Sequence, residues 1–267
     1  MPHDHPAADP MGQAILDYAT EGKHHHPLVV HSPDFDDDEI PVPYLFRTLS
    51  DMPRLEQQAL SLCRGRVLDV GAGAGCHSLA LQTAGKEVVS VDISPLSTQA
   101  RQMRGVKQAL VADLFSDELP GSFDTILLLM NGLGIAGTLQ RLPLLLRRCR
   151  ALLSPGGVVL ADSTNLCYLY DDDEQASLAA DARRAAQTVV KQQARQLQKP
   201  SRRASDVPYY YGQVTYSMSY GALHGPLFPW LYVDYESLLT IAAACGFRAE
   251  RIAEGPDHAY LAALTLV

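Results

Sequence analysis

Residues 65–75 read GRVLDVGAGAG, an apolar run that ends in three alternating glycines. The run is typical of a buried strand, yet it contains one acidic side chain, Asp69. Burying an ionised carboxylate among apolar neighbours is unfavourable unless the carboxylate is hydrogen-bonded, so we expect Asp69 to serve binding rather than packing. Glycines allow a sharp turn and the close approach of a ligand to the backbone. The stretch therefore predicts a strand that leads into a cofactor-binding loop.

The sequence around this stretch alternates between helical and strand-like segments. Helices are predicted at residues 54–63, 76–84, 95–103 and 138–153, and strands at residues 65–70, 87–92, 108–112, 123–130 and 157–162. The nearly unbroken apolar run in 123–130 indicates burial on both faces of a parallel sheet. This alternation predicts an α/β fold with a doubly wound, mostly parallel sheet, right-handed crossovers and helices on both faces.

The C-terminal segment follows a different pattern. A helix is predicted at residues 236–245, followed by strands at 247–254 and 258–266. The turn between these two strands, Gly-Pro-Asp, is so short that the strands must be antiparallel. We therefore expect the parallel sheet to be closed by an antiparallel hairpin.

Taken together, the glycine loop, the alternating segments and the final hairpin resemble the class I S-adenosylmethionine-dependent methyltransferases. The resemblance covers residues 65–162 and, less closely, 236–266. It implies a seven-stranded Rossmann-like sheet, S-adenosyl-L-methionine as cofactor and S-adenosyl-L-homocysteine as product. A nicotinamide or flavin fold instead requires G-x-G-x-x-G/A, and here the sixth position is Cys76. A nicotinamide-dependent oxidoreductase and a non-catalytic cofactor-binding protein remain the alternatives, although no Tyr-x-x-x-Lys pair is visible.

Acidic residues recur at the predicted strand ends. Asp92 follows Gly71 by 21 residues, and Asp113 follows Asp92 by a further 21. A carboxylate at the position of Asp92 can accept both ribose hydroxyls. The resemblance implies that Asp113 binds the adenine amino group while the Leu114 backbone contacts the ring edge, the alternative being a turn or helix cap. The predicted cofactor-binding residues are Asp69, Gly71, Ala72, Gly73, Gly75, His77, Asp92, Ile93, Asp113, Leu114, Met130, Asn131 and Gly132, although His77 has the alternative of only capping or lining its helix.

The loop at residues 130–134 faces the acceptor in the resembling family. It lacks the Asn-Pro-Pro-Tyr signature for methylation of adenine or glutamine amino groups, and the chain has no Pro-Cys pair of the kind that cytosine C5 enzymes use. Metal-assisted methylation requires acids after the fourth and fifth strands, and Asn131 stands where the first is expected, so we predict no metal. The expected acceptor is an oxygen or nitrogen atom of a small molecule.

Methyl transfer from a sulfonium asks little of the side chains beyond alignment and removal of a proton. The candidates for a base or an orienting group are Asn131, Asp162, His224 and Tyr44. The candidates for contact with the acceptor are Tyr44, Arg47, Asp162 and Trp230.

Segments outside the core are expected to form the acceptor site. We divide the chain into residues 1–53, a tail and active-site cover; 54–162, the cofactor-binding core; 163–234, an inserted helix and hairpin; and 235–267, which complete the sheet. The insertion has a predicted helix at 174–199 and strands at 210–220 and 227–233, which form either a lid or a dimer-forming hairpin. Six of the nine histidines lie in the first 31 residues, and we interpret this region as a solvated tail rather than a weak metal site.

Composition limits the remaining possibilities. With 267 residues and 47% hydrophobic content, the chain can bury a full core. A net charge of -8 argues against a nucleic-acid partner, because such partners require clustered Lys and Arg. The first 15 residues lack the regions of a signal peptide, and no apolar run has the length of a membrane span. We therefore expect a cytoplasmic protein, with a homodimer as a further expectation.

Overall fold

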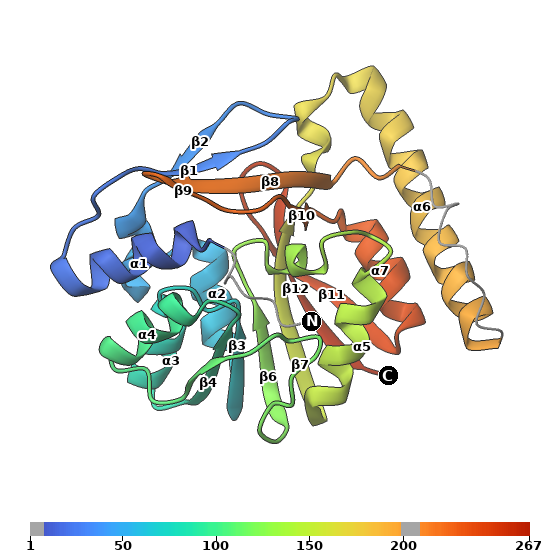
Figure 1. The fold of residues 1–267 in the computed structure, drawn as a ribbon. Coiled ribbons are helices and arrows are strands. Elements are labelled where there is room, and N and C mark those ends of the chain that lie inside the picture. The colour runs from blue at the N-terminus through green and yellow to red at the C-terminus, as the bar shows by residue number, and fades with distance from the viewer. Residues whose placement is uncertain (1–7, 199–208) are drawn as a thin grey trace.

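The computed structural model describes residues 8–198 and 209–267 of the chain (Figure 1). Its main sheet has seven strands in the order β11-β12-β7-β6-β3-β4-β5. Their bounds are β3 Arg66–Val70, β4 Glu87–Asp92, β5 Ala109–Val111, β6 Phe123–Leu128, β7 Leu153–Thr164, β11 Phe247–Glu254 and β12 Ala259–Leu266. Strands β3 to β7 pair in parallel, whereas β12 pairs antiparallel with both β7 and β11. The predicted doubly wound sheet with its closing hairpin is confirmed.

Alternate strand residues face two helical layers. The helices of the core are α2 Arg54–Leu62, α3 Cys76–Thr83, α4 Pro95–Met103, α5 Leu142–Leu152 and α7 Tyr235–Ala244. Leu68 and Ile126 belong to the buried cluster that includes residues of α5 and α7, whereas Val67 and Leu127 belong to the cluster that includes residues of α2 and α3. Successive strand residues point to opposite faces, which is why the consecutive residues Ile126, Leu127 and Leu128 of β6 are all apolar and buried.

A second, antiparallel sheet lies above one end of the main sheet (Figure 1). This cap sheet contains β1 Leu28–His31, β2 Asp38–Ile40, β8 Gln213–Tyr220, β9 Leu223–His224 and β10 Phe228–Leu231. Its order is β10-β8-β1-β2, with β9 on β8, so the predicted pairing of β8 with β10 is confirmed. The pairing of β1 with β8 was not predicted. It joins two segments, 1–53 and 163–234, that the sequence analysis had treated as separate.

The expectation of a solvated N-terminal tail is wrong for residues 10–21 and 28–31, which form α1 and β1, whereas His25 and His26 between these elements are exposed. Helix α1 Pro10–Glu21 begins with Asp9, whose carboxylate accepts a hydrogen bond from the Gly12 amide at 2.8 Å, and with Pro10 in its first turn. Ala14 and Ile15 are fully buried, and the helix packs against α4. The segment is therefore an integral layer of the fold.

The predicted inserted helix is present and begins at Asp172, two residues before its predicted start at Glu174. Helix α6 Asp172–Gln198 buries Ala182, Ala185, Ala186 and Val189 in the main core and contacts α7, so it packs beside the sheet. Its predicted end at Lys199 lies outside the described residues. Short 3₁₀ turns complete the cover of the site: η1 Val42–Phe46, η2 Leu49–Asp51, η3 Gly132–Ala136 and η4 Leu166–Leu169. Within residues 8–198 and 209–267, no helix combines the length and the apolar character needed to cross a bilayer.

Candidate functional site

The glycine loop joins β3 to α3 at the end of the main sheet that faces the cap sheet. Gly71, Gly73 and Gly75 all have positive φ, from 48° to 83°. The amides of Gly71 and Ala72 donate to the carbonyl of Val91, which fixes the loop to the neighbouring strand β4. A Cβ on residue 75 would lie 3.0 Å from the Arg101 side chain, so both backbone angle and space favour glycine there. The predicted loop is thus formed.

Asp69 lies beneath this loop with a relative exposure of 2%. Its Oδ2 accepts a hydrogen bond from the Ser78 hydroxyl at 2.5 Å. This bond offsets the unfavourable burial that the sequence analysis identified and ties β3 to α3. A direct contact between Asp69 and the cofactor stays a prediction.

Asp92 ends β4 directly beside the loop. Its Oδ2 accepts from the Gly73 amide and its Oδ1 from the Ser94 amide, both at 2.9 Å. Burial raises the pKa of Asp92, although the two amide hydrogen bonds oppose this shift. The next residue, Ile93, is 75% exposed and offers an apolar surface beside the carboxylate. This pair suits a nucleoside, because a carboxylate can accept hydrogen bonds from ribose hydroxyls while the exposed apolar side chain packs against the base.

Helix α1 covers this region, which the sequence analysis did not anticipate. Asp9 accepts a hydrogen bond from the Ser94 hydroxyl, and Ile15 reaches within 3.9 Å of the position that a Cβ would take on Gly73. The Asp-Pro pair at the start of the helix and the apolar pair Ala14-Ile15 are the signals that could have predicted it. The cofactor loop therefore has a helical cover from the N-terminal segment.

Asp113 takes the local role that the sequence analysis kept as its alternative. Its Oδ1 accepts from the Phe115 amide at 2.9 Å and its Oδ2 from the Ser116 hydroxyl at 3.2 Å. The Leu114 side chain is buried in the core, so only its backbone can contact a ligand. The contacts of these two residues with adenine stay predictions.

The turn after β6 carries two consecutive residues in the left-handed region. Met130 has a φ of 62° and Asn131 a φ of 55°, a backbone conformation that residues other than glycine rarely adopt. The turn places Asn131 Oδ1 where it accepts a hydrogen bond from the Thr164 hydroxyl at 2.9 Å. It also directs the Gly132 amide toward Asp162 Oδ1 at 3.3 Å. Asn131, Gly132 and Asp162 are thus brought together, as predicted for the methyl-transfer region.

Asp162 is the most perturbed carboxylate in this region. Burial raises the pKa of Asp162 to about 6, although hydrogen bonding from the Gly132 amide opposes the shift. Asp162 and Thr164 are two residues apart on β7 and therefore share one face of the strand. A carboxylate with a pKa near neutrality can exchange a proton with a bound acceptor.

A buried ionic cluster of Arg47, Glu56 and His77 lies beside the loop. Glu56 Oε2 accepts from Arg47 Nη2 at 2.6 Å and from His77 Nε2 at 2.8 Å. All three side chains are at most 8% exposed. The structure therefore does not support the predicted contacts of Arg47 with the acceptor or of the His77 side chain with the cofactor, because Glu56 binds both groups.

The cluster instead holds Tyr44. Arg47 Nη1 donates to the Tyr44 carbonyl at 2.8 Å, and the guanidinium lies 4.2 Å from the Tyr44 ring centroid. Tyr44 itself is 39% exposed. Burial raises the pKa of Tyr44, and the nearby charge of Asp162 raises it further. Tyr44 remains a candidate for covering the site.

The cluster predicts a pH dependence of stability. Burial alone would lower the pKa of His77, but hydrogen bonds to Cys76 and Glu56 raise it from 6.5 to about 10. The stabilisation from protonated His77 is therefore complete below pH 6.5 and is lost as the pH rises toward 10. The pKa of Glu56 is lowered from 4.5, so its contribution is complete above that value and is lost in acid.

Urea unfolding of the wild type at about pH 6 and about pH 9 should show a lower free energy of unfolding at the higher pH. A His77→Gln variant should lose less stability over the same interval, because its side chain has no proton to release. An equal loss in both proteins would contradict the assigned role of His77.

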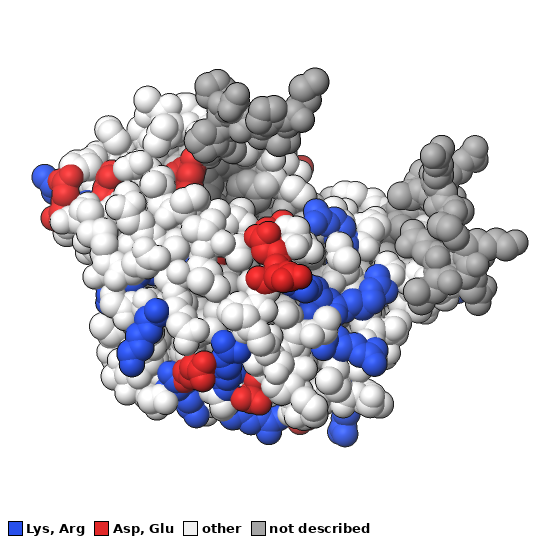
Figure 2. All heavy atoms as spheres, turned by 60° about the horizontal axis from the view of Figure 1, so that its bottom comes forward, with Lys and Arg blue, Asp and Glu red and all other residues white. Residues whose placement is uncertain are grey.

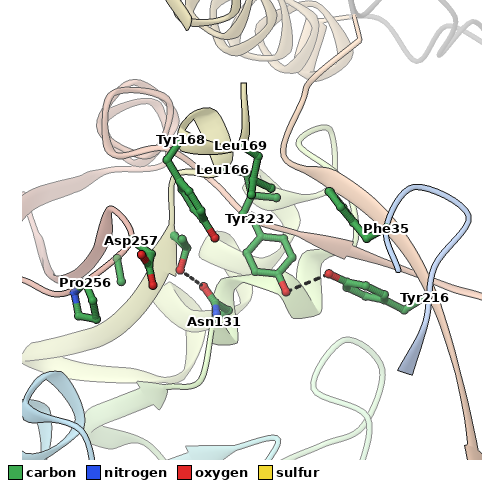
Figure 3. Close-up of a pocket in the computed structure, with 11 residues that line it drawn as sticks. Phe35, Asn131, Leu166, Tyr168, Leu169, Tyr216, Tyr232, Pro256 and Asp257 are labelled. Carbon is green, nitrogen blue, oxygen red and sulfur yellow. Dashed lines mark hydrogen bonds between the residues drawn. The ribbon is translucent and has the colours of Figure 1, made fainter. Parts of the chain in front are cut away.

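A cavity of about 380 Å³ opens beside Asn131 (Figure 3). Its walls are the aromatic side chains Phe35, Tyr168, Tyr216 and Tyr232, together with Asn131, Thr164, Leu166, Leu169, Pro256, Asp257 and Ala259. Figure 3 shows Tyr168 and Tyr232 standing over Asn131. Apart from Asn131, none of these residues is predicted from the sequence, because they converge from the β1–β2 connection, η4, β8, the residue after β10 and the β11–β12 turn.

Two predicted site residues lie elsewhere. Trp230 packs on η3: a Cβ on residue 134 would come within 2.2 Å of its ring, so only glycine fits there. Trp230 thus attaches the cap sheet to the turn after β6 and is outside the residues that line the cavity. His224 is exposed on β9 and pairs with Ser219, so the structure does not support a catalytic role for it.

Comparison with known proteins agrees with this geometry. Residues 68–161 match a family described as a methyltransferase domain. An S-adenosylmethionine-dependent methyltransferase from Bacteroides fragilis, solved in complex with S-adenosyl-L-homocysteine, is 43% identical, with a TM-score of 0.82 over 98% of this chain and 97% of that one. The fold and the loop define a class I methyltransferase. The chain belongs to the S-adenosylmethionine-dependent methyltransferases, and its cofactor is S-adenosylmethionine.

More distant relatives match in part. A ubiquinone biosynthesis O-methyltransferase of Xanthomonas euvesicatoria is 28% identical over 116 residues, which are 40% of this chain and 46% of that protein. The chain thus spans about half the length of the curated relatives it matches. The sugar N-methyltransferase KedS8 from Streptoalloteichus is 17% identical, with a TM-score of 0.52 over 83% of this chain and 87% of that one, which shows the fold alone.

Proposed function

We propose that the protein transfers a methyl group from S-adenosylmethionine to an oxygen or nitrogen atom of a small molecule bound in the aromatic cavity. The observation that carries this proposal is the strained Met130–Asn131 turn. The turn contacts Asp162 through the Gly132 amide and lines the cavity through Asn131. It follows directly after β6, which is the neighbour of β3, the strand that leads into the glycine loop. A strained turn between a cofactor loop and a cavity is typical of a functional site.

The residues around the glycine loop fit this cofactor. Asp92 is positioned to accept the ribose hydroxyls, the exposed Ile93 to pack against adenine, and the loop from Gly71 to Gly75 to let the backbone approach the ligand. When bound, S-adenosylmethionine supplies a methyl group already activated on a positively charged sulfur. The protein therefore has to align the acceptor and remove a proton.

Asp162 is proposed as the group that accepts this proton. Its pKa of about 6 leaves it ionised at neutral pH, and it shares a strand face with Thr164 in the cavity wall. Asn131 is proposed to orient the acceptor, because its side chain lines the cavity and is held by Thr164. Tyr44 is proposed to cover the reacting groups.

Ligand binding tests the cofactor site. S-adenosyl-L-homocysteine should raise the melting temperature in a concentration-dependent manner, whereas NADH should not. Asp92→Ala should weaken S-adenosyl-L-homocysteine binding by about 1.5–3 kcal/mol, the scale of hydrogen bonds to a charged group. Glu236→Ala, which removes an exposed acid on α7, is the matched control and should leave the affinity unchanged. Preferential stabilisation by NADH, or unchanged affinity in Asp92→Ala, would contradict the assignment.

The remaining expectations are proposals of the same kind. The Xanthomonas relative is named as an O-methyltransferase and matches only part of this chain, so both oxygen and nitrogen acceptors stay within this proposal. A nucleic-acid substrate is not proposed, because the net charge is -8 and acidic side chains stand among the basic ones on the face in Figure 2. A cytoplasmic location and a homodimer are retained as proposals.

A further inference from the structure

The cavity combines aromatic walls with negative charge. Tyr216 and Tyr232 meet nearly at right angles, with ring planes at 78° and centroids 6.5 Å apart. Their hydroxyls lie 3.2 Å apart, which fixes the two rings relative to each other. Tyr168 forms another wall, and its ring is stacked on the ring of His258 with the two centroids 5.9 Å apart. Three tyrosine rings thus line one cavity: Tyr216 and Tyr232 are held by contact with each other, and Tyr168 is held by contact with His258.

The charge around these rings is acidic. Among the described residues that line the cavity, Asp257 is charged and none is Lys, Arg or His. Burial raises the pKa of Tyr216, the hydrogen bond with Tyr232 lowers it, and the negative charges of Asp34 and Asp38 raise it. Burial and the negative charge of Asp257 both raise the pKa of Tyr168. The acids therefore lie close enough to affect the aromatic walls electrostatically.

The turn that carries Asp257 is itself unusual. Asp257 and His258 both have positive φ, 51° and 56°, and the Ala259 amide donates to the Pro256 carbonyl across the turn. Such turns favour glycine, and Asn, Asp and His are the other residues most often found at positive φ. Here the hairpin turn with two positive φ angles places a carboxylate in the same cavity wall as Tyr168, across the cavity from Tyr216 of the cap sheet (Figure 3).

From these observations we propose that the acceptor is a cationic amine, whose ammonium group is held between the rings of Tyr168, Tyr216 and Tyr232 and beside Asp257. This inference rests on the proposed methyl transfer and selects nitrogen over oxygen. Aromatic faces attract cations through the ring quadrupole, and carboxylates strengthen this attraction. A carboxylate, phosphate or phenolate acceptor would meet repulsion and find no cationic side chain among the described lining residues.

The reaction balances with the groups present. The bound ammonium loses one proton to the Asp162 carboxylate, and the nitrogen lone pair then forms the new bond to the methyl carbon. As the bond between sulfur and that carbon breaks, its electron pair stays on sulfur, which becomes a neutral thioether. The positive charge passes from sulfur to nitrogen, so the product is again a cation that suits the same aromatic walls.

Binding of matched probes tests the recognition step without requiring turnover. Protein saturated with S-adenosyl-L-homocysteine is titrated by calorimetry with benzyltrimethylammonium, benzyl alcohol and benzoate. Benzyltrimethylammonium should bind roughly tenfold more tightly than benzyl alcohol, the scale of cation–π contacts in a partly desolvated site. Benzoate should bind most weakly of the three.

Two pairs of variants locate the effect. Tyr232→Leu should abolish the preference for the cation, whereas Tyr232→Phe, which keeps the aromatic face, should retain most of it. Asp257→Asn should reduce the preference, and Glu236→Ala on the surface of α7 should not. If Tyr232→Leu leaves the affinity for the cation unchanged, the probe binds elsewhere and the inference fails.

The outcomes separate this inference from the function on which it rests. No binding of S-adenosyl-L-homocysteine would contradict the methyltransferase proposal and this inference together. Binding of S-adenosyl-L-homocysteine combined with equal or tighter binding of benzyl alcohol or benzoate, or with no binding of the cation at millimolar concentration, would contradict the cationic acceptor alone.

Discussion

Replacing Glu56 with alanine is expected to lower the free energy of unfolding by about 3–5 kcal/mol, the usual result of breaking a buried ion pair from one side. Glu56 Oε2 accepts hydrogen bonds from both Arg47 and His77, and it is 4% exposed. Without Glu56, the buried Arg47 guanidinium and His77 imidazole lose the carboxylate that binds both of them. Equilibrium unfolding in urea measures the change.

Two controls make this prediction specific. Glu87→Ala removes the carboxylate of a partly exposed pair with Arg66, whose atoms are 2.8 Å apart, and should change stability by less than about 1 kcal/mol. Glu56→Gln retains a hydrogen-bond acceptor and should fall between the wild type and Glu56→Ala. A loss in Glu56→Ala no larger than that in Glu87→Ala would show that the cluster is not a stabilising centre.

The cluster connects stability to the active site. Through Arg47 it holds η1 and thereby Tyr44, and through His77 it holds the first turn of α3 beside the glycine loop. Loosening of the cluster should therefore weaken cofactor binding along with the fold. This explains why two charged residues that the sequence analysis had selected for ligand contact are buried: they support the site from behind.

The core could be predicted because its signals are local. The bounds of β4, α4 and β11 agree with the sequence-based ranges, since each is set by an apolar pattern with a polar or glycine boundary. The cap sheet could be predicted only in part. The hairpin of β8 and β10 has a short connection, but the partner of β8 on its other side, β1, precedes it by about 180 residues, and no local pattern specifies such a pairing.

The residues of the candidate site also divide into those that the sequence predicts and those that it does not. The loop glycines and Asp92 follow directly from strand ends and were therefore predictable. Tyr168 in η4, Tyr216 in β8 and Tyr232 just after β10 are far apart in the sequence or on different elements, and they converge only in the folded chain. The exposed His224 shows the opposite error, because a residue type suited to catalysis was selected without knowledge of where β9 would lie.

Replacing Asp162 with asparagine is expected to lower kcat by roughly 10²-fold or more, the typical contribution of a positioned general base. The acceptor for this assay is the amine or phenol that gives the fastest turnover with the wild type, present at saturating concentration with S-adenosylmethionine. Because burial raises the pKa of Asp162 to about 6, the rate of the wild type should rise with pH through that value and then level off as the carboxylate becomes ionised.

The pH profile distinguishes a base from a residue that only shapes the turn. Asp162→Asn can still accept a hydrogen bond from the Gly132 amide but cannot take a proton, so its rate should lose the rise near pH 6. Thr164→Val removes the hydroxyl that donates to Asn131 and leaves the carboxylate intact, so it should slow the reaction and keep the rise. A slow Asp162→Asn enzyme with an unchanged profile would mean that the carboxylate positions the Met130–Asn131 turn and that the proton leaves by another route.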